Sequence, residues 1–178
     1  MMSIIKQVGL KEELLASVET TFSHFNDLLE RFDRDNINAI PFHGSWTAAQ
    51  VADHVTKSNQ SIAKALLLYG TIINRNPFAR VEELKTIFLN FDTKLQSPDF
   101  ILPDKELYEK ANLVNTLIES VHKIIEAGNK VELLEMINHV AFGDITKFEI
   151  LHFVIYHTQR HTHQLKKIAE ALNKKFIQ

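Results

Sequence analysis

The sequence predicts an all-α protein built as a four-helix bundle. Only five glycines and four prolines interrupt its 178 residues, and apolar residues recur at steps of three and four along four long segments. Each apolar stripe covers one face of a helix, and four helices can bury their stripes in one core. We therefore expect one domain over residues 1–178.

The first two helices have clear boundaries. The first ends at the turn-forming run DRDNINAIP. The second begins at Thr47, which can form a capping box with Gln50, while Trp46 can pack onto Val51. The predicted buried stripes are Leu14, Val18, Phe22, Phe25, Leu29 and Phe32 in the first helix, and Val51, Val55, Ile62, Leu66 and Tyr69 in the second.

A long connection, residues 70–103, separates the second and third helices and contains one short amphipathic piece at residues 78–91. A connection of this length can cross the whole bundle. The second and third helices are therefore expected to be parallel.

The last two helices complete the bundle. The third is expected to stop at Gly128. The fourth begins with a second capping box, Thr146 with Glu149, and Ile145 can pack onto Ile150. The predicted stripes are Leu107, Ala111, Val114, Ile118, Val121 and Ile125 in the third helix, and Ile150, Val154, His157, His161, Leu165, Ile168 and Leu172 in the fourth.

Two histidines occupy that last apolar stripe. His157 and His161 lie one turn apart on one helix face, a spacing that suits a shared metal ion. His54 lies on or beside the buried face of the second helix. With a rise of about 1.5 Å per residue, it sits roughly 23 Å from the end of its helix, and the pair roughly 16 and 22 Å from the start of theirs. Antiparallel helices would bring all three imidazoles together.

Two interpretations of these histidines stay open. Each can be a core residue hydrogen-bonded to a carbonyl group or water, or together they can hold a divalent metal as neutral imidazoles. With unperturbed pKa values of about 6.5, three such ligands are expected to release metal between roughly pH 6 and 5. Ser58 and Gln164, one turn from His54 and His161, are candidates to orient the ligands.

Other polar residues carry weaker expectations. Thr158 follows His157 where a zinc protease motif has glutamate, so no built-in general base is present and the catalytic residues remain unknown. His139 is expected roughly 16 Å along the bundle axis from His157, in a loop-packing role. The residues expected to face solvent are Arg160, His163, Lys166 and Lys167.

The amino-acid composition limits the kinds of molecule that the protein is expected to bind. With 20 basic and 22 acidic residues, the chain offers no charge excess to attract nucleic acid or an anionic membrane. The start MMSIIKQVGLKEELL becomes charged too early for a signal peptide, and no run of about 18 apolar residues could span a membrane. A cytoplasmic protein is expected. Because the chain has no cysteine, a metal must be held by His, Asp or Glu.

The segments SWTAAQVADHV and NHVAFGDITKFEILHFVIYHTQRHTHQL resemble the DinB/YfiT-like superfamily of metal-dependent enzymes. The shared pattern is a loop histidine, a glycine, an Ile-Thr helix start, His-x-x-x-His and a glutamine, here His139, Gly143, Ile145, Thr146, His157, His161 and Gln164. The resemblance implies an up-down-down-up bundle, often homodimeric, with nickel or zinc on three histidines, here His54, His157 and His161. Members include transferases and an isomerase that use low-molecular-weight thiols, and hydrolases.

Two departures limit what the resemblance carries over. Many relatives have an acidic residue where this chain has Lys57, and proline is common where it has Val140. The leading hypothesis is a metal-dependent S-transferase or hydrolase acting on a small molecule, with any thiol taken from solution. The alternative is a non-catalytic dimeric bundle that binds metal or a small apolar ligand.

Overall fold

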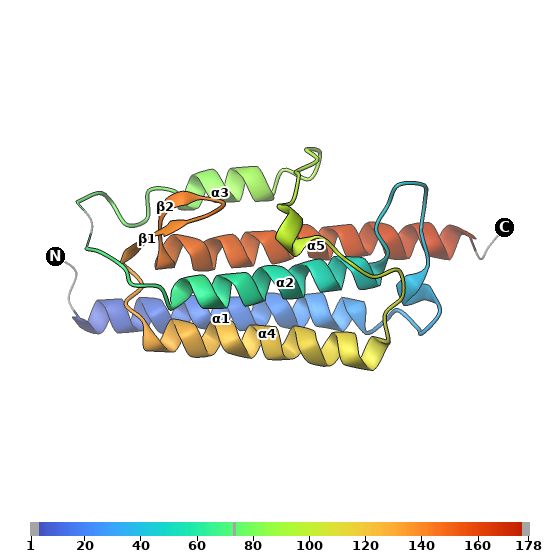
Figure 1. Ribbon diagram of the computed structural model, residues 1–178, viewed down its shortest axis with the longest axis horizontal. Helices are drawn as coiled ribbons and strands as arrows, with labels where there is room; N and C mark the ends of the chain where they lie inside the picture. Colours follow the sequence, from blue (N-terminus) through green and yellow to red (C-terminus); the bar gives the residue numbers. More distant parts are fainter. Residues whose placement is uncertain (1–3, 73, 176–178) are drawn as a thin grey trace.

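The computed structural model describes residues 4–72 and 74–175. Four long helices lie side by side along the long axis (Figure 1): α1 (Ile4–Leu29), α2 (Ala48–Leu66), α4 (Lys110–Lys130) and α5 (Lys147–Lys175). The connections carry a short helix and four smaller elements: α3 (Val81–Phe88), η1 (Asn36–Asn38), η2 (Asp99–Ile101), β1 (Met136–His139) and β2 (Gly143–Thr146). The predicted four-helix bundle is confirmed.

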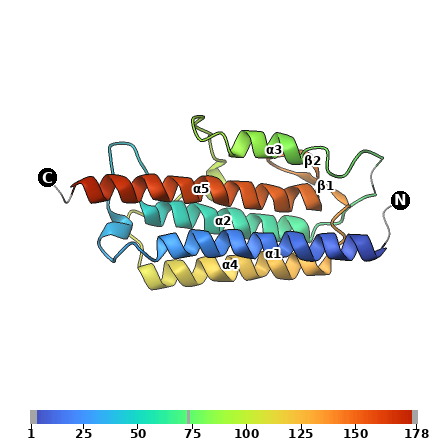
Figure 2. The same ribbon diagram turned by 180° about the vertical axis from the view of Figure 1, so that it is seen from behind.

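The helix directions follow the up-down-down-up order. In Figure 1, α1 and α5 run one way along the axis, and α2 and α4 run the other way. The long connection thus joins two parallel helices, as its length predicted, while α2 and α5 are antiparallel. The short helix α3 packs against α5, on the side of the bundle away from α4 (Figure 2).

Most of the predicted core is buried. Every residue of the stripe predicted for the fourth helix, from Ile150 to Leu172, is buried, and so is the stripe from Leu14 to Phe32. Tyr69 was wrongly assigned to the second stripe. Since α2 ends at Leu66, Tyr69 lies beyond the helix and is fully exposed.

The stripe predicted for the third helix is wrong in its register. The helix α4 begins only at Lys110, capped by Glu109, so Leu107 lies outside it and is 75% exposed. Its buried face consists of Leu113, Val114, Leu117, Ser120, Val121, Ile124, Ala127 and Gly128. Gly128 does not end the helix: a Cβ atom there would lie 2.6 Å from Cδ2 of Leu15, so glycine allows α4 to approach α1 closely.

A β-hairpin, which the sequence did not predict, precedes α5. Strands β1 and β2 pair antiparallel from Met136 opposite Thr146 to His139 opposite Gly143. Gly143 has φ of +62°, a backbone conformation that favours glycine and closes the turn. With four residues each, these strands are too short to leave a recognisable alternation in the sequence.

Both predicted capping boxes are present. At the start of α2, the Gln50 N–H donates to Oγ1 of Thr47 (3.1 Å) and the Thr47 N–H donates to the Gln50 side chain (3.0 Å). Thr146 and Glu149 make the same reciprocal bonds at the start of α5 (2.9 and 3.1 Å). The caps fix where each helix begins, and therefore which way its histidines point.

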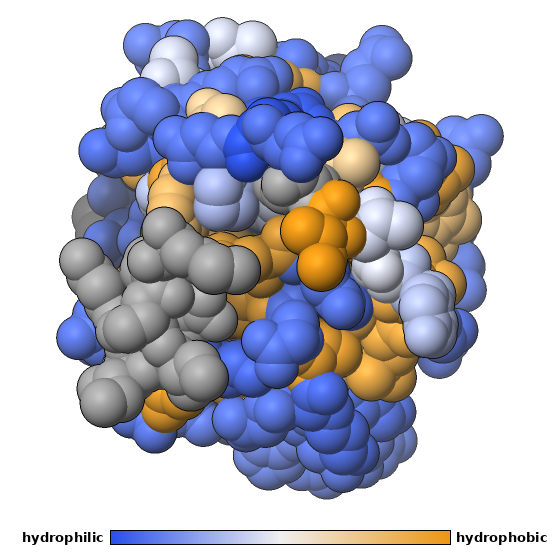
Figure 3. Space-filling view, turned by 90° about the vertical axis from the view of Figure 1, so that its left-hand side faces the viewer, coloured by the Kyte–Doolittle hydropathy of each residue, from blue (hydrophilic) through white to orange (hydrophobic). Residues whose placement is uncertain are grey.

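The surface is mixed. Figure 3 looks along the bundle at the end where α2 stops, and it shows hydrophobic residues between hydrophilic ones. The segment that follows α2 contributes exposed apolar side chains, among them Leu67, Leu68 and Ile72. Within residues 4–72 and 74–175, no helix combines the length and the apolar character that crossing a membrane requires.

Glu149 fastens the crossover connection to the bundle. Its fully buried carboxylate accepts both terminal nitrogens of Arg75 (2.7 Å each), the backbone N–H of Arg80 (2.9 Å) and that of Thr146 (2.9 Å). Burial by itself raises the pKa of Glu149, but the bonds from Arg75 and the two backbone groups outweigh it, and the pKa lies below its ordinary value.

We predict that Glu149→Gln lowers the free energy of unfolding by about 2 kcal/mol at pH 7, because Arg75 loses its counter-charge and a buried network is broken. The control is Glu126→Gln in the exposed pair with Lys130, which should cost less than about 0.5 kcal/mol. Since the folded pKa lies below the unfolded one, the Glu149 contribution is complete at neutral pH and is lost on acidification. Urea unfolding curves at pH 7 with equal midpoints for the two variants would contradict this.

Candidate metal centre

The three histidines predicted from the sequence meet between α2 and α5. Nε2 of His157 lies 3.1 Å from Nε2 of His54 and 3.1 Å from Nε2 of His161. One ligand atom from each residue lies within 4.8 Å of the others, and all three side chains are buried. The antiparallel packing of α2 against α5 brings the three residues to the same level.

The outer nitrogens of two rings are held by oxygen atoms. Nδ1 of His54 lies 2.9 Å from the backbone oxygen of Ile101, and Nδ1 of His161 lies 2.8 Å from Oε1 of Gln164. These oxygens can only accept, so each Nδ1 carries the proton of a neutral ring and each Nε2 presents a lone pair. Gln164 thus contacts the ligand that the sequence suggested. For His54 the partner is Ile101 rather than Ser58.

The inward-facing lone pairs cannot satisfy one another. If Nε2 of His157 carries a proton, that single N–H faces two acceptors and can bond well to only one of them. If the proton is on Nδ1, three lone pairs converge on one point. A cation at that point satisfies all three nitrogens at once.

Burial keeps the cluster neutral. Desolvation is the largest effect and lowers the pKa of His54, His157 and His161 below the ordinary value. The proximity of the other histidines adds to it for His157 and His161, and the pKa of His161 falls to about 3 in all. Neutral imidazole is the form that binds metal. For a metal held by this cluster, we therefore expect acid release below the window of pH 6 to 5 that ordinary pKa values predict.

The donor set and its spacing fit a transition-metal ion. Two nitrogens bound to one tetrahedral ion at 2.0–2.1 Å lie about 3.3 Å apart, close to the 3.1 Å separations here. Three neutral imidazoles suit zinc or nickel, whereas magnesium and calcium prefer oxygen ligands. Two of the three nitrogen–nitrogen separations thus match a tetrahedral ion, and the third lies within 4.8 Å.

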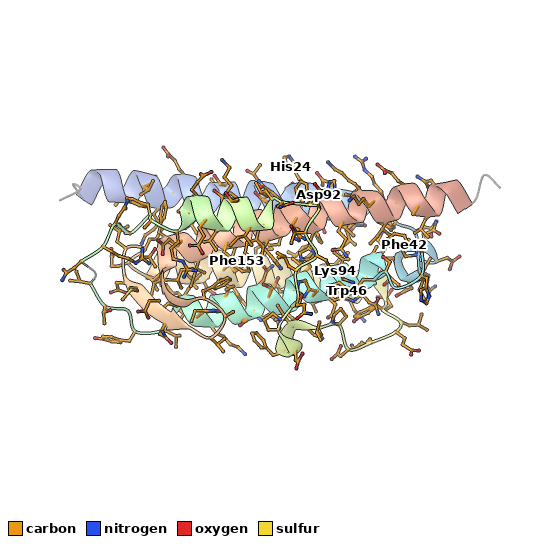
Figure 4. The ribbon with its side chains drawn as sticks, turned by 90° about the horizontal axis from the view of Figure 1, so that it is seen from above. His24, Phe42, Trp46, Asp92, Lys94 and Phe153 are labelled. Carbon is orange, nitrogen blue, oxygen red and sulfur yellow. The ribbon has the colours of Figure 1, made fainter. Side chains whose placement is uncertain are left out.

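A cavity of about 290 Å³ opens onto the cluster. Its apolar wall includes Phe88, Phe142 and Phe153, and the rings of Phe88 and Phe153 lie 6.0 and 5.0 Å from the ring of His157. Trp46 packs on His54 at 5.1 Å. Seen from above in Figure 4, the connection that carries Lys94 passes over the bundle between Phe153 and Trp46.

His139 belongs to the wall of this cavity, which the sequence did not predict. The estimate of 16 Å along the axis assumed a loop beyond the helix end, but the hairpin folds back along α5. His139 stacks on Phe142 (5.1 Å), and Phe142 packs on Phe153 (4.7 Å). The Ala141 N–H donates to Nδ1 of His139 (3.1 Å), so the proton of the neutral ring is on Nε2.

Arg160 also lines the cavity, and its predicted outward position is wrong. Its Nη1 donates to the backbone oxygens of Phe88 (3.3 Å) and Asn90 (2.7 Å), and its Nη2 to that of Thr93. The helix α3 and the following connection cover this face of α5, which periodicity alone cannot show. His163 stacks on Phe91 at 4.2 Å, while Lys166 and Lys167 are exposed as expected.

Lys57 secures the connection that orients His54. Its Nζ forms ion pairs with Asp53 and Asp104 (3.0 Å each) and donates to the backbone oxygen of Leu102 (2.8 Å). Leu102 follows Ile101, whose carbonyl oxygen accepts the hydrogen bond from Nδ1–H of His54. Lys57 therefore supports the centre from outside and does not enter it.

Comparison with known proteins supports the fold and identifies the family. One similar solved structure is YfiT from Bacillus subtilis, which is described as a probable metal-dependent hydrolase with an unusual four-helix bundle topology. It is 14% identical to this chain, with a TM-score of 0.59, and the match covers 97% of this chain and 91% of YfiT. TT2238, a four-helix bundle protein, is 18% identical with a TM-score of 0.57, covering 88% of this chain and 98% of TT2238. The comparison with curated proteins finds no significant match. The sequence profile of the DinB superfamily matches residues 17–165, and the chain therefore belongs to the DinB superfamily.

Proposed function

We propose that the protein is a divalent-metal-dependent enzyme that acts on a small molecule, as a thiol-dependent S-transferase or a hydrolase. The observation that carries the proposal is the convergence of three neutral Nε2 atoms at one edge of a cavity. Nickel or zinc is the metal proposed, since imidazole suits both.

A divalent metal bound by three imidazoles supplies Lewis acidity, which lowers the pKa of a water molecule or thiol that it binds. The chain positions the ligands: Ile101 and Gln164 fix two rings through their Nδ1 protons. The phenylalanines around His157 exclude bulk water from one side of the centre. Nε2–H of His139 can donate a hydrogen bond to a molecule in the cavity.

Transfer and hydrolysis differ in the nucleophile. The chain has no cysteine, so a transferred sulfur must come from a thiol in solution. Hydrolysis needs only water, and the description of YfiT as a probable metal-dependent hydrolase supports that branch. Thiol consumption with a panel of electrophiles, measured beside ester and amide hydrolysis, separates the two reactions.

A second candidate is a bundle that binds metal or a small apolar ligand without turnover. It is favoured by the largely apolar cavity wall and by the lack of a carboxylate among the described residues that line it. Metal binding without activity in either assay would support it. The homodimer and the cytoplasmic location expected from the sequence stay predictions.

We predict that His54→Ala lowers metal content from about one ion per chain to a small fraction, because one of three ligands is lost. His122→Ala is the matched control, since His122 is exposed on α4. Elemental analysis of both variants, purified without a histidine tag, measures the effect. Full occupancy in the His54→Ala protein would contradict a three-histidine site.

We predict that Gln164→Ala weakens metal binding about 10-fold, because His161 loses the acceptor that fixes its ring. Gln159→Ala removes an exposed amide from the same helix and should leave the affinity unchanged. Competition with a chelator of known affinity gives both values. Equal affinities for the two variants would show that Gln164 does not orient the ligand.

We predict that acid destabilises the chelator-treated protein through His161. Its folded pKa of about 3 lies below the unfolded value of about 6.5, so its contribution is complete above pH 6.5 and is lost as the pH falls toward 3. Between pH 7.5 and 5 this amounts to about 2 kcal/mol. Urea unfolding at both pH values gives the drop in the free energy of unfolding between pH 7.5 and 5. This drop should be smaller by that amount in His161→Phe than in the unaltered protein, and unchanged in His122→Ala. An unchanged loss in His161→Phe would contradict burial of a neutral ring.

A further inference from the structure

The cavity beside the histidine cluster carries positive charge without a counter-charge. Among the described residues, its lining contains one cation, Arg160, and no aspartate or glutamate. Asp53 is the acidic residue that acts on His54, but it is paired with Lys57 (3.0 Å) and accepts a hydrogen bond from Tyr108 (2.9 Å). Its charge is therefore already balanced outside the cavity.

Arg160 has no carboxylate partner in the described part of the chain. Three of its five N–H groups donate to backbone oxygens of Phe88, Asn90 and Thr93, and the Nε–H and the second Nη2–H have no acceptor there. Burial lowers the pKa of Arg160, and no acidic group offsets this effect. The guanidinium group is thus held in place by neutral groups, and its charge remains available to a ligand.

The metal of the proposed function adds to this charge. Three neutral imidazoles contribute none, so a divalent ion and Arg160, whose charge acts on His157 and His161, together place about three positive charges on the lining of a largely apolar cavity. Uncompensated charge next to apolar walls is unfavourable, and an anion that enters the cavity reduces the cost. The phenylalanines near His157 provide an apolar surface for the remainder of such a molecule.

We propose that the cavity selects a small organic anion, with an apolar body packed against Phe88, Phe142 and Phe153 and an anionic group directed toward Arg160 and the histidine cluster. The charge of the cluster rests on the proposed metal, whereas the contribution of Arg160 does not. The two contributions can therefore be measured separately.

The test compares 3-phenylpropionate with 3-phenylpropanol, which share the phenyl group and differ in charge. Isothermal titration calorimetry at pH 7.5, on chelator-treated protein, isolates the effect of Arg160. We expect the carboxylate to bind about 10-fold more tightly than the alcohol, the gain expected of one charge-assisted contact. Repeating the titration on metal-loaded protein should increase that preference further.

Three variants test whether Arg160 causes the preference for the carboxylate. Arg160→Met should abolish it in the chelator-treated protein, Arg160→Lys should keep part of it, and Lys167→Met should keep all of it, since Lys167 is exposed on the same helix. Arg160→Met can fail to fold, because it releases the segment after α3. In that case the affinities of the two probes for the unaltered protein still show whether the cavity prefers the anion.

Three results would overturn the inference: equal affinity for the two probes, no binding of either, or a preference that survives in Arg160→Met. Metal content is measured on the same samples, so the proposed function is tested separately. Protein that holds metal but shows no preference for the anion would refute the anion site and leave the metal centre standing.

Discussion

The site depends on the fixed direction of two ring protons. Since Nδ1 of His54 and of His161 face oxygen atoms that only accept, their Nε2 lone pairs must point inward. Other parts of the fold supply the conditions for this arrangement. The residue Ile101 must lie beside α2, Gln164 must lie one turn beyond His161, and α2 must pack antiparallel to α5. Water could not supply these partners as reliably, because the rings are buried.

The crossover connection is part of the site. Its first section is fastened to the start of α5 by Arg75 and Glu149, its middle by Arg160, and its last section by Lys57. Between these attachments it contributes the wall residue Phe88 and the carbonyl oxygen of Ile101. Four helices alone would place the histidines together, but they would leave His54 without its acceptor and the cavity without one wall.

Local patterns were enough to predict the bundle and the histidine cluster. Capping boxes identify helix starts within a few residues, and steps of three and four place His157 and His161 inside. The contacts made by the connections could not be predicted in this way. Arg160 was expected outside because the sequence does not show that α3 covers α5. His139 was misplaced because a hairpin of four-residue strands leaves no periodic signal, and Leu107 because α4 begins later than its apolar residues suggest.

The carbonyl oxygen of Ile101 has a consequence for how such proteins diverge. A backbone atom is supplied by any amino acid, so substitutions at position 101 preserve the acceptor as long as the chain keeps its path. The neighbouring side chains Ser97, Pro98 and Phe100 line the cavity, and they too can change without disturbing the ring of His54. The path of this segment and its side chains therefore serve different parts of the site: the path places the acceptor for His54, and the side chains shape the cavity wall. Substitutions at these positions would change the cavity wall while the acceptor of His54 stays in place, and comparing sequences at position 101 would not reveal the role of its carbonyl group.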